Sequence, residues 1–484
     1  MLENRAFDHM LGFSGITGTD AASGQPTRIN GLAGTETNTF NGQTFQVSPS
    51  AGFVMPSDPG HEFDNVLEQL CGPGATYSPG RYPPIVNTGF VASYVATGGQ
   101  ARPDEIMKCF TSTSLPVLHA LAREFVVCDN WHASMPGATW PNRLFVHAAS
   151  AAGLDHSPTT AEIVLWESLS GFSFQNGTIF DAMRAKNVSR RLYAGDEFPM
   201  VSALKGIGLA DIRLYHLFAQ DVAQPNYPFS YTFIEPSYNV LNDYKGSTSQ
   251  HPLDDVTRGE MLIKATYEAI RNSPLWNNSL LIITWDEHGG FYDHAIPPPA
   301  IAPGDTEAAH NKFGFTFDQY GPRVPAIVVS PLIPRNLVDH RLYDHASIPA
   351  TLEAIFGLNA LTRRDAAANN LTSLVSLATP RGDAPTTLPQ PAQSGFSLLP
   401  TFAAAEFVAA TMAPPARPSD PVNEGNLPGV IQAALRSDLA LSPPEQRAQI
   451  LAHVSSLKTR ADADQYLRQV RQKVRAAKTT PATA

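Results

Sequence analysis

The chain has 484 residues, a hydrophobic content of 43% and a formal net charge of −10, enough for one large domain or two to three average ones. The negative charge argues against nonspecific nucleic-acid binding, and no apolar run approaches the roughly 20 residues that a membrane span needs. The cysteines, Cys71, Cys109 and Cys128, lack metal-ligand spacing and allow either one disulfide or three free thiols.

The first 60 residues are predicted to consist mostly of loops. Only Met1-Leu2 precede the polar run Glu3-Asn4-Arg5, so the basic segment and apolar core of a secretory signal are not seen. The chain as it stands is expected to be cytoplasmic, and a truncated start would instead imply a secreted or periplasmic protein. A hairpin is predicted at Asn41-Gly42. His61, in the turn at residues 57–63, is either a solvated turn histidine or a site residue.

A helix and then a buried strand are predicted before residue 129. Leu115, Leu118 and Leu121 recur at helical spacing, and residues 125–128 form a short apolar run. The polar stretch that follows leads into a helix that begins near Thr139. A hydroxyl there lies where free N–H groups and the helix dipole favour anions. The alternative is that Thr139 only caps the helix.

Strands and helices continue to alternate up to residue 356. Strands are predicted at residues 191–193, 231–234, 280–284 and 324–330, and helices at 179–185, around 261–270 and at 348–356. This alternation predicts an α/β fold with a mostly parallel central sheet and helices on both faces.

The stretch at residues 285–294 follows the predicted strand at 280–284 and is the densest in reactive side chains. It places Asp286, Glu287 and Asp293 around the Gly289-Gly290 loop. In open α/β sheets, ligands usually bind at this end of the strands. The alternative is an acidic turn with solvated side chains.

The composition changes after about residue 360. Residues 361–425 are predicted to be a Pro-rich connector with a short helix, and residues 426–484 a helical C-terminal extension. One of its helices is predicted to start at Ser442, with proline at the first helical position and Glu445 at the third. The last helix carries basic residues that either complement the helix dipole or bind anionic lipid headgroups. They are Arg468, Arg471, Lys473, Arg475 and Lys478.

Loop and strand-end residues indicate phosphate chemistry. The candidates are Glu3, Asn4, His61, Thr139, His251, Asp286 and Glu287. Carboxylates and imidazoles suit a divalent cation. A hydroxyl beside a cation can lose its proton and attack phosphorus, while the cation and a helix N-terminus stabilise the phosphoryl oxygens. The residues therefore predict phosphoester hydrolysis through a covalent phosphothreonine.

Four motifs, in this order, resemble the phosphoesterase family. They are Glu3-Asn4-Arg5-Ala6-Phe7-Asp8-His9, Asp58-Pro59-Gly60-His61-Glu62, Met135-Pro136-Gly137-Ala138-Thr139-Trp140-Pro141-Asn142-Arg143 and Asp286-Glu287-His288-Gly289-Gly290-Phe291-Tyr292-Asp293-His294. That family holds the bacterial and plant non-specific phospholipases C and related acid phosphatases, and its fold is that of the alkaline phosphatase superfamily. The resemblance covers about residues 1–358, so residues 1–360 are expected to form the catalytic domain.

The resemblance implies a role for each matched residue. Thr139 would be the nucleophile, since the phospholipase branch uses threonine where the acid phosphatase branch uses serine. His61 and His251 would contact phosphate or protonate the leaving group. One divalent metal ion would be held, or the site ordered in metal-independent members, by Glu3, Asn4, Asp286 and Glu287. Candidates for supporting contacts around the substrate are Asn142, His132, Glu235 and Asp293.

The chain departs from the family pattern at two places. Family members usually have a hydrophobic strand before the Glu-Asn-Arg motif, but here only Met1-Leu2 precede it. Without that strand, Glu3 and Asn4 are expected on a fraying terminus. The C-terminal region is expected to be helical, unlike the β-sandwich modules of some bacterial phospholipases C.

Three hypotheses follow for the function. The first is a phospholipase C acting on phospholipids, with peripheral contact to a membrane surface. The second is a broad-specificity phosphomonoesterase with an acid optimum that uses the same residues on small phosphoesters. The third is a degenerate, non-catalytic member that acts as a binding protein. None of them involves nucleic acid, and the sequence carries no signal for an oligomeric state.

Overall fold

The computed structural model describes residues 1–169, 171–305, 310–395 and 415–479. Its fold is α/β and is built around a six-stranded sheet with the order β2-β1-β11-β5-β10-β9. The strands are β1 (Thr17–Asp20), β2 (Pro26–Arg28), β5 (Val126–Cys128), β9 (Leu281–Thr284), β10 (Ala326–Val329) and β11 (Leu337–Asp339). In the described residues β1, β11, β5 and β9 run in one direction, because β10 lies antiparallel between β5 and β9. The predicted mostly parallel sheet is confirmed.

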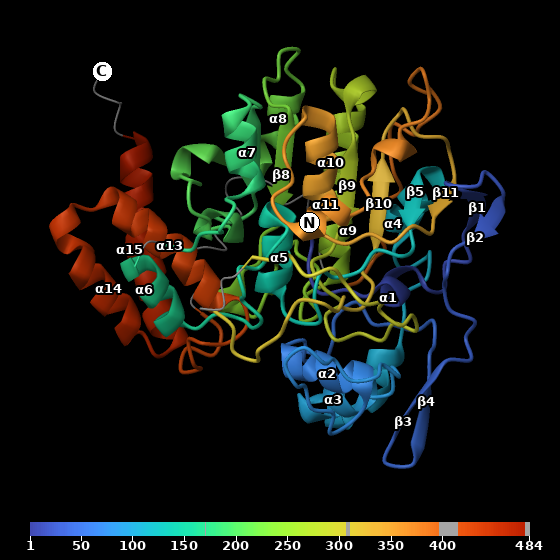
Figure 1. The fold of residues 1–484 in the computed structure, drawn as a ribbon, viewed down its shortest axis with the longest axis horizontal. Helices are drawn as coiled ribbons and strands as arrows, with labels where there is room; N and C mark the ends of the chain where they lie inside the picture. The colour runs from blue at the N-terminus through green and yellow to red at the C-terminus, as the bar shows by residue number, and fades with distance from the viewer. Residues whose placement is uncertain (170, 306–309, 396–414, 480–484) are drawn as a thin grey trace.

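A second, all-parallel sheet lies beside the first. It has the order β7-β6-β8, formed by Ile212–Leu214, Arg190–Ala194 and Tyr231–Glu235. The first two residues connect the sheets, since Met1 donates from its amino group to Ile234 O (3.1 Å) and Leu2 N–H donates to Thr284 O (2.9 Å). Leu2 also forms a parallel bridge with Trp285. The segment that carries Glu3 and Asn4 therefore enters the molecule between β8 and β9 (Figure 1).

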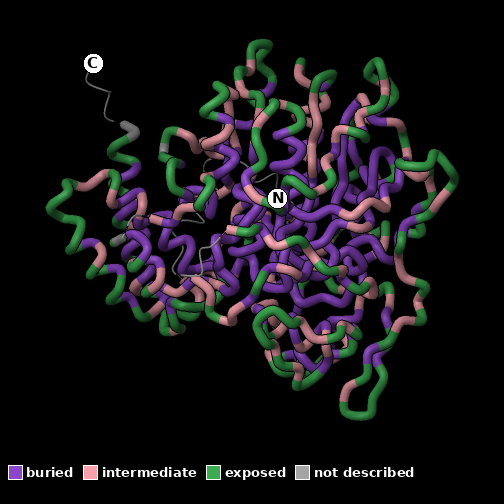
Figure 2. The backbone as a smooth tube through the Cα atoms, viewed as in Figure 1, coloured by how far each residue is buried: buried purple, intermediate pink, exposed green. Residues whose placement is uncertain are grey.

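Helices cover both faces of the main sheet. On one side α4 (Pro116–Glu124) packs against β5 and β10 and is joined by α9 (Val256–Arg271), while α5 (Thr139–Ala148) packs against α10 (Ser347–Phe356) and α7 (Ile179–Ala185). β5 and β10 are buried along their whole length, which explains why they are continuous apolar runs in the sequence. Seen with Figure 1, the colouring by burial in Figure 2 shows that the interior of the molecule around the main sheet is mostly buried.

A smaller region with its own core lies below the sheet in Figure 1. It contains α2 (Phe63–Cys71), α3 (Phe90–Ala96) and the hairpin of β3 (Thr37–Phe40) and β4 (Gln43–Gln46), near α1 (Phe7–Leu11). The hairpin turn is the predicted Asn41-Gly42, whose φ angles of 48° and 76° fit a tight two-residue turn.

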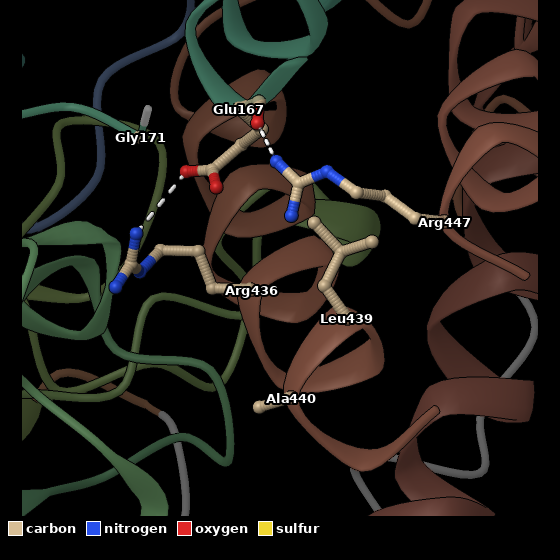
Figure 3. A pocket seen from close by; sticks show the side chains of 6 residues that line it. All are labelled: Glu167, Gly171, Arg436, Leu439, Ala440 and Arg447. Atoms are coloured by element: carbon tan, nitrogen blue, oxygen red, sulfur yellow. Dashed lines mark hydrogen bonds and ion pairs between the residues drawn. The ribbon is translucent and has the colours of Figure 1, made fainter. Parts of the chain in front are cut away.

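The C-terminal helices form a bundle against α6 (Thr160–Leu169). They are α13 (Leu427–Leu441), α14 (Arg447–Ser456) and α15 (Arg460–Thr479). Arg436 donates to Glu167 Oε1 (3.2 Å) and Arg447 to Glu167 O across a cavity between α6 and these helices (Figure 3). Both arginines thereby attach the bundle to α6.

The basic residues of α15 are engaged in ion pairs within the protein. Arg471 and Arg475 both bond to Glu197, which follows β6, and Lys473 Nζ lies 2.6 Å from Asp438 Oδ1. Arg468 pairs with Asp464 one turn earlier. The side chain of Lys478 lies outside the described residues. These contacts connect α15 to α13 and to the second sheet.

The helix predicted to start at Ser442 begins later. Ser442 instead follows the last residue of α13 and donates from its hydroxyl to Asp438 Oδ1 (3.2 Å). A short 3-10 turn covers Pro444–Gln446, and α14 begins at Arg447. The prediction was wrong because this serine is used by the preceding helix. The connector begins with a short helix, α11 (Arg363–Ala367). The short helix predicted further along the connector falls in residues 396–414, which lie outside the described part.

The three cysteines are free thiols. No helix in the described part of the chain combines the length and the hydrophobicity that crossing a membrane requires.

Candidate active site

The acidic loop after β9 packs tightly against two other segments. Asp286 and Glu287 are fully buried. Gly289 (φ +66°) and Gly290 (φ +75°) follow, and a Cβ at these glycines would collide with Asn4 O and with Gly60 O, respectively. Both glycines therefore supply the left-handed backbone and the close approach that bring the N-terminal segment and the His61 loop to the acids.

Glu3 and Asn4 are anchored rather than frayed. Glu3 N–H donates to Ser249 O (3.0 Å) and Asn4 N–H donates to Asp286 Oδ1 (3.0 Å). Both side chains are fully buried, and Asn4 is held at a φ of 59°. The expectation of a fraying terminus was wrong, because Met1 and Leu2 bond to strands on either side.

Thr139 is the first residue of α5 and does not cap it. The N-cap is Ala138, which has no capping side chain, and Thr139 Oγ donates instead to Asn4 Oδ1 (3.2 Å). The capping alternative was therefore wrong. Asn142, on the next turn, shapes the loop before Thr139, since it accepts from Met135 N–H (3.1 Å) and donates to Gly137 O (3.0 Å).

The four predicted metal ligands form two pairs of sequence neighbours, Glu3-Asn4 and Asp286-Glu287, which the bond from Asn4 N–H to Asp286 Oδ1 joins. In the described part of the chain, their three carboxylates do not form a group whose ligand atoms all lie within 4.8 Å of one another. Glu3 Oε1 and Glu287 Oε1 are buried and lack a hydrogen-bond partner among the described residues. Burial, reinforced by the Asp286 carboxylate, raises the pKa of Glu3 to about 8. Burial also raises the pKa of Asp286 to about 6, although Arg143 acts to lower it. The unpartnered oxygen atoms of Glu3 and Glu287 are suited to binding a hard cation such as Mg²⁺ or Ca²⁺, whereas both oxygens of Asp286 already accept hydrogen bonds, one of them from Arg143.

A second acidic cluster is paired with a buried arginine. Ligand atoms of Asp8, Asp293 and His294 lie within 4.8 Å of one another, a spacing that could hold a metal ion. However, the buried guanidinium of Arg323 bonds to Asp8 Oδ1 (3.0 Å) and Asp293 Oδ1 (2.9 Å). Asp293 thus supports the fold through Arg323.

Arg143 belongs to the site although its role was not predicted. Its Nε donates to Asp286 Oδ2 (2.9 Å) and its NH2 to Leu2 O (2.9 Å). Its position four residues after Thr139, on the same face of α5, is the signal that could have identified it.

The two histidines have opposite electrostatic environments. Burial acts to lower the pKa of His61, but Glu287, Asp58 and Glu62 outweigh it and raise this pKa to about 9. Burial and the nearby charge of His61 lower the pKa of His251 well below its ordinary value. At neutral pH His61 is therefore an imidazolium and His251 a neutral imidazole.

The orientation of both rings follows from their hydrogen bonds. His61 Nδ1 bonds to Pro59 O (3.0 Å), so its Nε2 is available. Leu253 N–H donates to His251 Nδ1 (3.3 Å), which leaves the ring proton of His251 on Nε2. This Nε2 lies 3.7 Å from Asp58 Oδ2. Asp58, which belongs to the second of the four motifs and has no predicted role, lies beside both histidines.

Two of the predicted supporting residues have their polar atoms engaged elsewhere. His132 bonds through its two ring nitrogens to Gly321 O (2.9 Å) and Asn130 Oδ1 (3.0 Å). Glu235, at the end of β8, accepts the N–H groups of Met200 and Val201. Their described bonds do not reach Thr139.

The C-terminal part contributes one residue to the site. Asn426, just before α13, donates from Nδ2 to Glu3 Oε2 (2.9 Å), and both residues are buried. Gly429 lies against the ring of Trp140, the residue after Thr139, and a Cβ there would overlap the indole. No local pattern around Asn426 indicates this contact, because its partner is 423 positions away.

Comparison with known proteins identifies the relatives of this chain. The model described as the Phosphoesterase family matches residues 1–359. Non-specific phospholipase C6 of Arabidopsis thaliana is 38% identical over 413 residues, which cover 81% of this chain and 74% of the relative. Phospholipase C B of Mycobacterium tuberculosis is 27% identical over 440 residues, which cover 83% and 81% of the two chains. A solved alkaline phosphatase superfamily protein from Vibrio parahaemolyticus aligns with 55% of this chain and 63% of its own, at 14% identity and a TM-score of 0.34.

Proposed function

Because the chain belongs to the phosphoesterase family and is a phosphoric ester hydrolase, we propose that it cleaves phospholipids as a phospholipase C, through a phosphothreonine at Thr139. One observation carries this proposal. The Thr139 hydroxyl lies at a helix N-terminus and bonds to Asn4, which is itself bonded to the buried acid Asp286. The names of the relatives, which include plant and bacterial phospholipases C, favour a lipid substrate.

The reaction proceeds in two displacements. Thr139 Oγ loses its proton to solvent water and attacks phosphorus, and the bond from phosphorus to the glycerol oxygen breaks; when the phosphothreonine is later hydrolysed, Thr139 Oγ takes a proton back from water. The His61 imidazolium donates its proton to that oxygen, and diacylglycerol leaves. Water then attacks the phosphothreonine, the bond from phosphorus to Thr139 Oγ breaks, and His61 accepts a proton from the water. The products are diacylglycerol and the phosphorylated headgroup.

The phosphoryl oxygens are held by groups that do not change their charge. The free N–H groups at the start of α5 point along the helix axis toward this position, and the Nε2–H of His251 is a further donor. A divalent ion held by Glu3, Asn4, Asp286 and Glu287 would supply positive charge for the threonine oxyanion. The lipid would be taken from a membrane surface by peripheral contact.

Of the two other hypotheses, one uses the same site on a different substrate and the other assumes that the site is not functional. A phosphomonoesterase with an acid optimum would employ the same residues, so only the choice of substrate distinguishes it. A non-catalytic member was suggested by the missing first strand, but Glu3 and Asn4 are buried and bonded. That argument for a degenerate site no longer holds.

The test is hydrolysis of phosphatidylcholine and of p-nitrophenyl phosphate by the wild type and by Thr139→Ala, each with and without EDTA. We expect release of diacylglycerol by the wild type, at least about 10³-fold less by Thr139→Ala, and a loss with EDTA that added divalent metal restores. Thr178→Ala is the matched control, because Thr178 caps α7 with its hydroxyl and lies on another helix.

The other outcomes separate the hypotheses. Cleavage of p-nitrophenyl phosphate alone would refute the phospholipase C proposal and favour the phosphomonoesterase hypothesis. Equal activity of the wild type and Thr139→Ala would refute the nucleophile, and no hydrolysis by the wild type would favour a binding protein.

A further inference from the structure

The ring of Tyr244 lies flat on the imidazole of His251. The ring centroids are 3.4 Å apart and the planes differ by 2°, and both side chains are buried. Because the tyrosine ring packs directly on one face of the imidazole, the imidazole has little room to tilt or to turn about its χ2 bond. On the ring edge, Leu253 N–H holds Nδ1.

The backbone around this stack is held in unfavourable conformations. Asp243 and Tyr244 are consecutive non-glycine residues with φ angles of 51° and 62°, and Gln250, which precedes His251, has a φ of 71°. Such residues persist where the surrounding structure fixes them, and they cluster at functional sites. Here three of them flank a single stacked pair.

Contacts from the C-terminal part fix Tyr244 in place. Asn426 N–H donates to the Tyr244 hydroxyl oxygen (3.2 Å). Asp243 Oδ1 accepts from Arg417 (2.7 Å) and from Arg460 (2.6 Å). The turn at Asp243 and Tyr244 is thus held by hydrogen bonds from the C-terminal part, while the tyrosine packs its ring on His251.

We propose that Tyr244 is a positioning residue that fixes the His251 ring so that its Nε2–H is directed at a phosphoryl oxygen of the substrate. This inference rests on the proposed function, because it deepens the role of His251 there. A donor held in place costs no reorganisation when charge develops on the phosphoryl group. The Tyr244 ring acts on the reaction through His251, while the Tyr244 hydroxyl contacts Asn426, which also bonds to Glu3. Tyr244→Phe removes the hydroxyl contact and keeps the ring, so it separates the two routes.

The test is a double-mutant cycle with Tyr244→Leu and His251→Gln in the full chain. Activity is measured on phosphatidylcholine, and binding of orthovanadate, which mimics the phosphoryl transition state, is measured by calorimetry. We expect each single variant to lose about tenfold or more in kcat/KM and in vanadate affinity, and the double variant to lose little more than His251→Gln alone. Tyr244→Phe, which keeps the stacked ring, should restore most of the loss.

Tyr215→Leu is the matched control, because Tyr215 is a buried tyrosine stacked on Phe218 (centroids 5.7 Å apart, planes at 15°) in a separate apolar cluster. Its effect should be independent of His251→Gln. Thermal melting checks that the variants fold, and Tyr244→Met carries the same cycle if Tyr244→Leu does not.

The outcomes distinguish this inference from the proposed function. If the wild type cleaves the lipid and binds vanadate but the effects of Tyr244→Leu and His251→Gln multiply independently, the positioning role is overturned and the proposed function stands. A wild type that neither cleaves the lipid nor binds vanadate would overturn both.

Discussion

Arg143 joins three parts of the site through one guanidinium. It extends from α5, which carries Thr139, and bonds to Asp286 on the acidic loop and to Leu2 O in the N-terminal segment. Lysine has a single ammonium and cannot reproduce the planar fork that makes these two bonds. The distance between Thr139, the proposed nucleophile, and the acids therefore depends on this arginine.

Arg143→Lys should lower kcat/KM on phosphatidylcholine by about 10- to 100-fold, because the nucleophile and the acids lose their common alignment. The measurement is steady-state kinetics with circular dichroism as a check of folding. Arg323→Lys disturbs a buried pair of the same kind, with Asp8 and Asp293, and should change kcat less. Equal losses in the two variants would mean that Arg143 only stabilises the fold.

At the scale of elements, the start of α6 is held by a histidine between two acids. His156 bonds to Asp155 Oδ1 (3.1 Å) and to Glu162 Oε1 (2.7 Å), and Glu162 also bonds to Thr159. Burial acts to lower the pKa of His156, but these two hydrogen bonds raise it to about 9. Burial acts to raise the pKa of Glu162, but its hydrogen bonds lower it to about 2.

The stability that His156 contributes should depend on pH with a definite sign. The raised pKa of His156 gives stability that is fully present below its ordinary value of 6.5 and lost as the pH rises through about 9. The lowered pKa of Glu162 gives stability that is present above its ordinary 4.5 and lost as the pH falls toward about 2. The contact is therefore strongest between these two ordinary values.

His156→Gln should lower Tm more at about pH 6 than at about pH 10, because the imidazolium is present only at the lower pH. Thermal melting across this range measures the difference. His453→Gln, at an exposed position of α14, should show no such pH dependence. An equal Tm loss for His156→Gln at both pH values would show that the charge of His156 does not stabilise the fold.

How far the sequence predicts an element depends on how local its causes are. β5, β10 and the helix after Thr139 follow from apolar runs and a turn that lie next to one another in the chain, and they form where expected. The prediction of a helix start at Ser442 was wrong because the serine hydroxyl bonds to Asp438 at the end of α13 instead of capping the next helix.

The same reasoning applies to the site. Glu3, Thr139 and Asp286 lie in dense motifs and could be identified from the sequence. The positions of Tyr244 and Asn426 depend on chain segments that meet only in the folded protein, so no local pattern indicates them.

At the scale of the whole molecule, the C-terminal part completes the site. Asn426 reaches Glu3, and Asn423 accepts from Thr160 N–H (2.9 Å) on α6. Both are asparagines of the same segment, but only Asn426 contacts a proposed metal ligand. A comparison of variants at Asn423 and Asn426 can therefore distinguish the docking of the C-terminal part from its effect on the site.

Asn426→Ala should weaken metal binding by about 10- to 100-fold, because residues that hydrogen-bond to a ligand orient it. The measurement is activity against concentration of the metal that restores the EDTA-treated wild type. Asn423→Ala should leave that curve unchanged. A curve that does not move for Asn426→Ala would show that Glu3 needs no support from the C-terminal part.

The central claim is that Thr139 becomes phosphorylated during turnover. Acid quenching of the wild type in the presence of phosphatidylcholine, followed by peptide mass spectrometry, tests this most directly. The account predicts phosphothreonine at residue 139, none in Thr139→Ala, and phosphoserine at this position in Thr139→Ser. Turnover by the wild type without a phosphorylated residue 139, or with the phosphate on another residue, would contradict it.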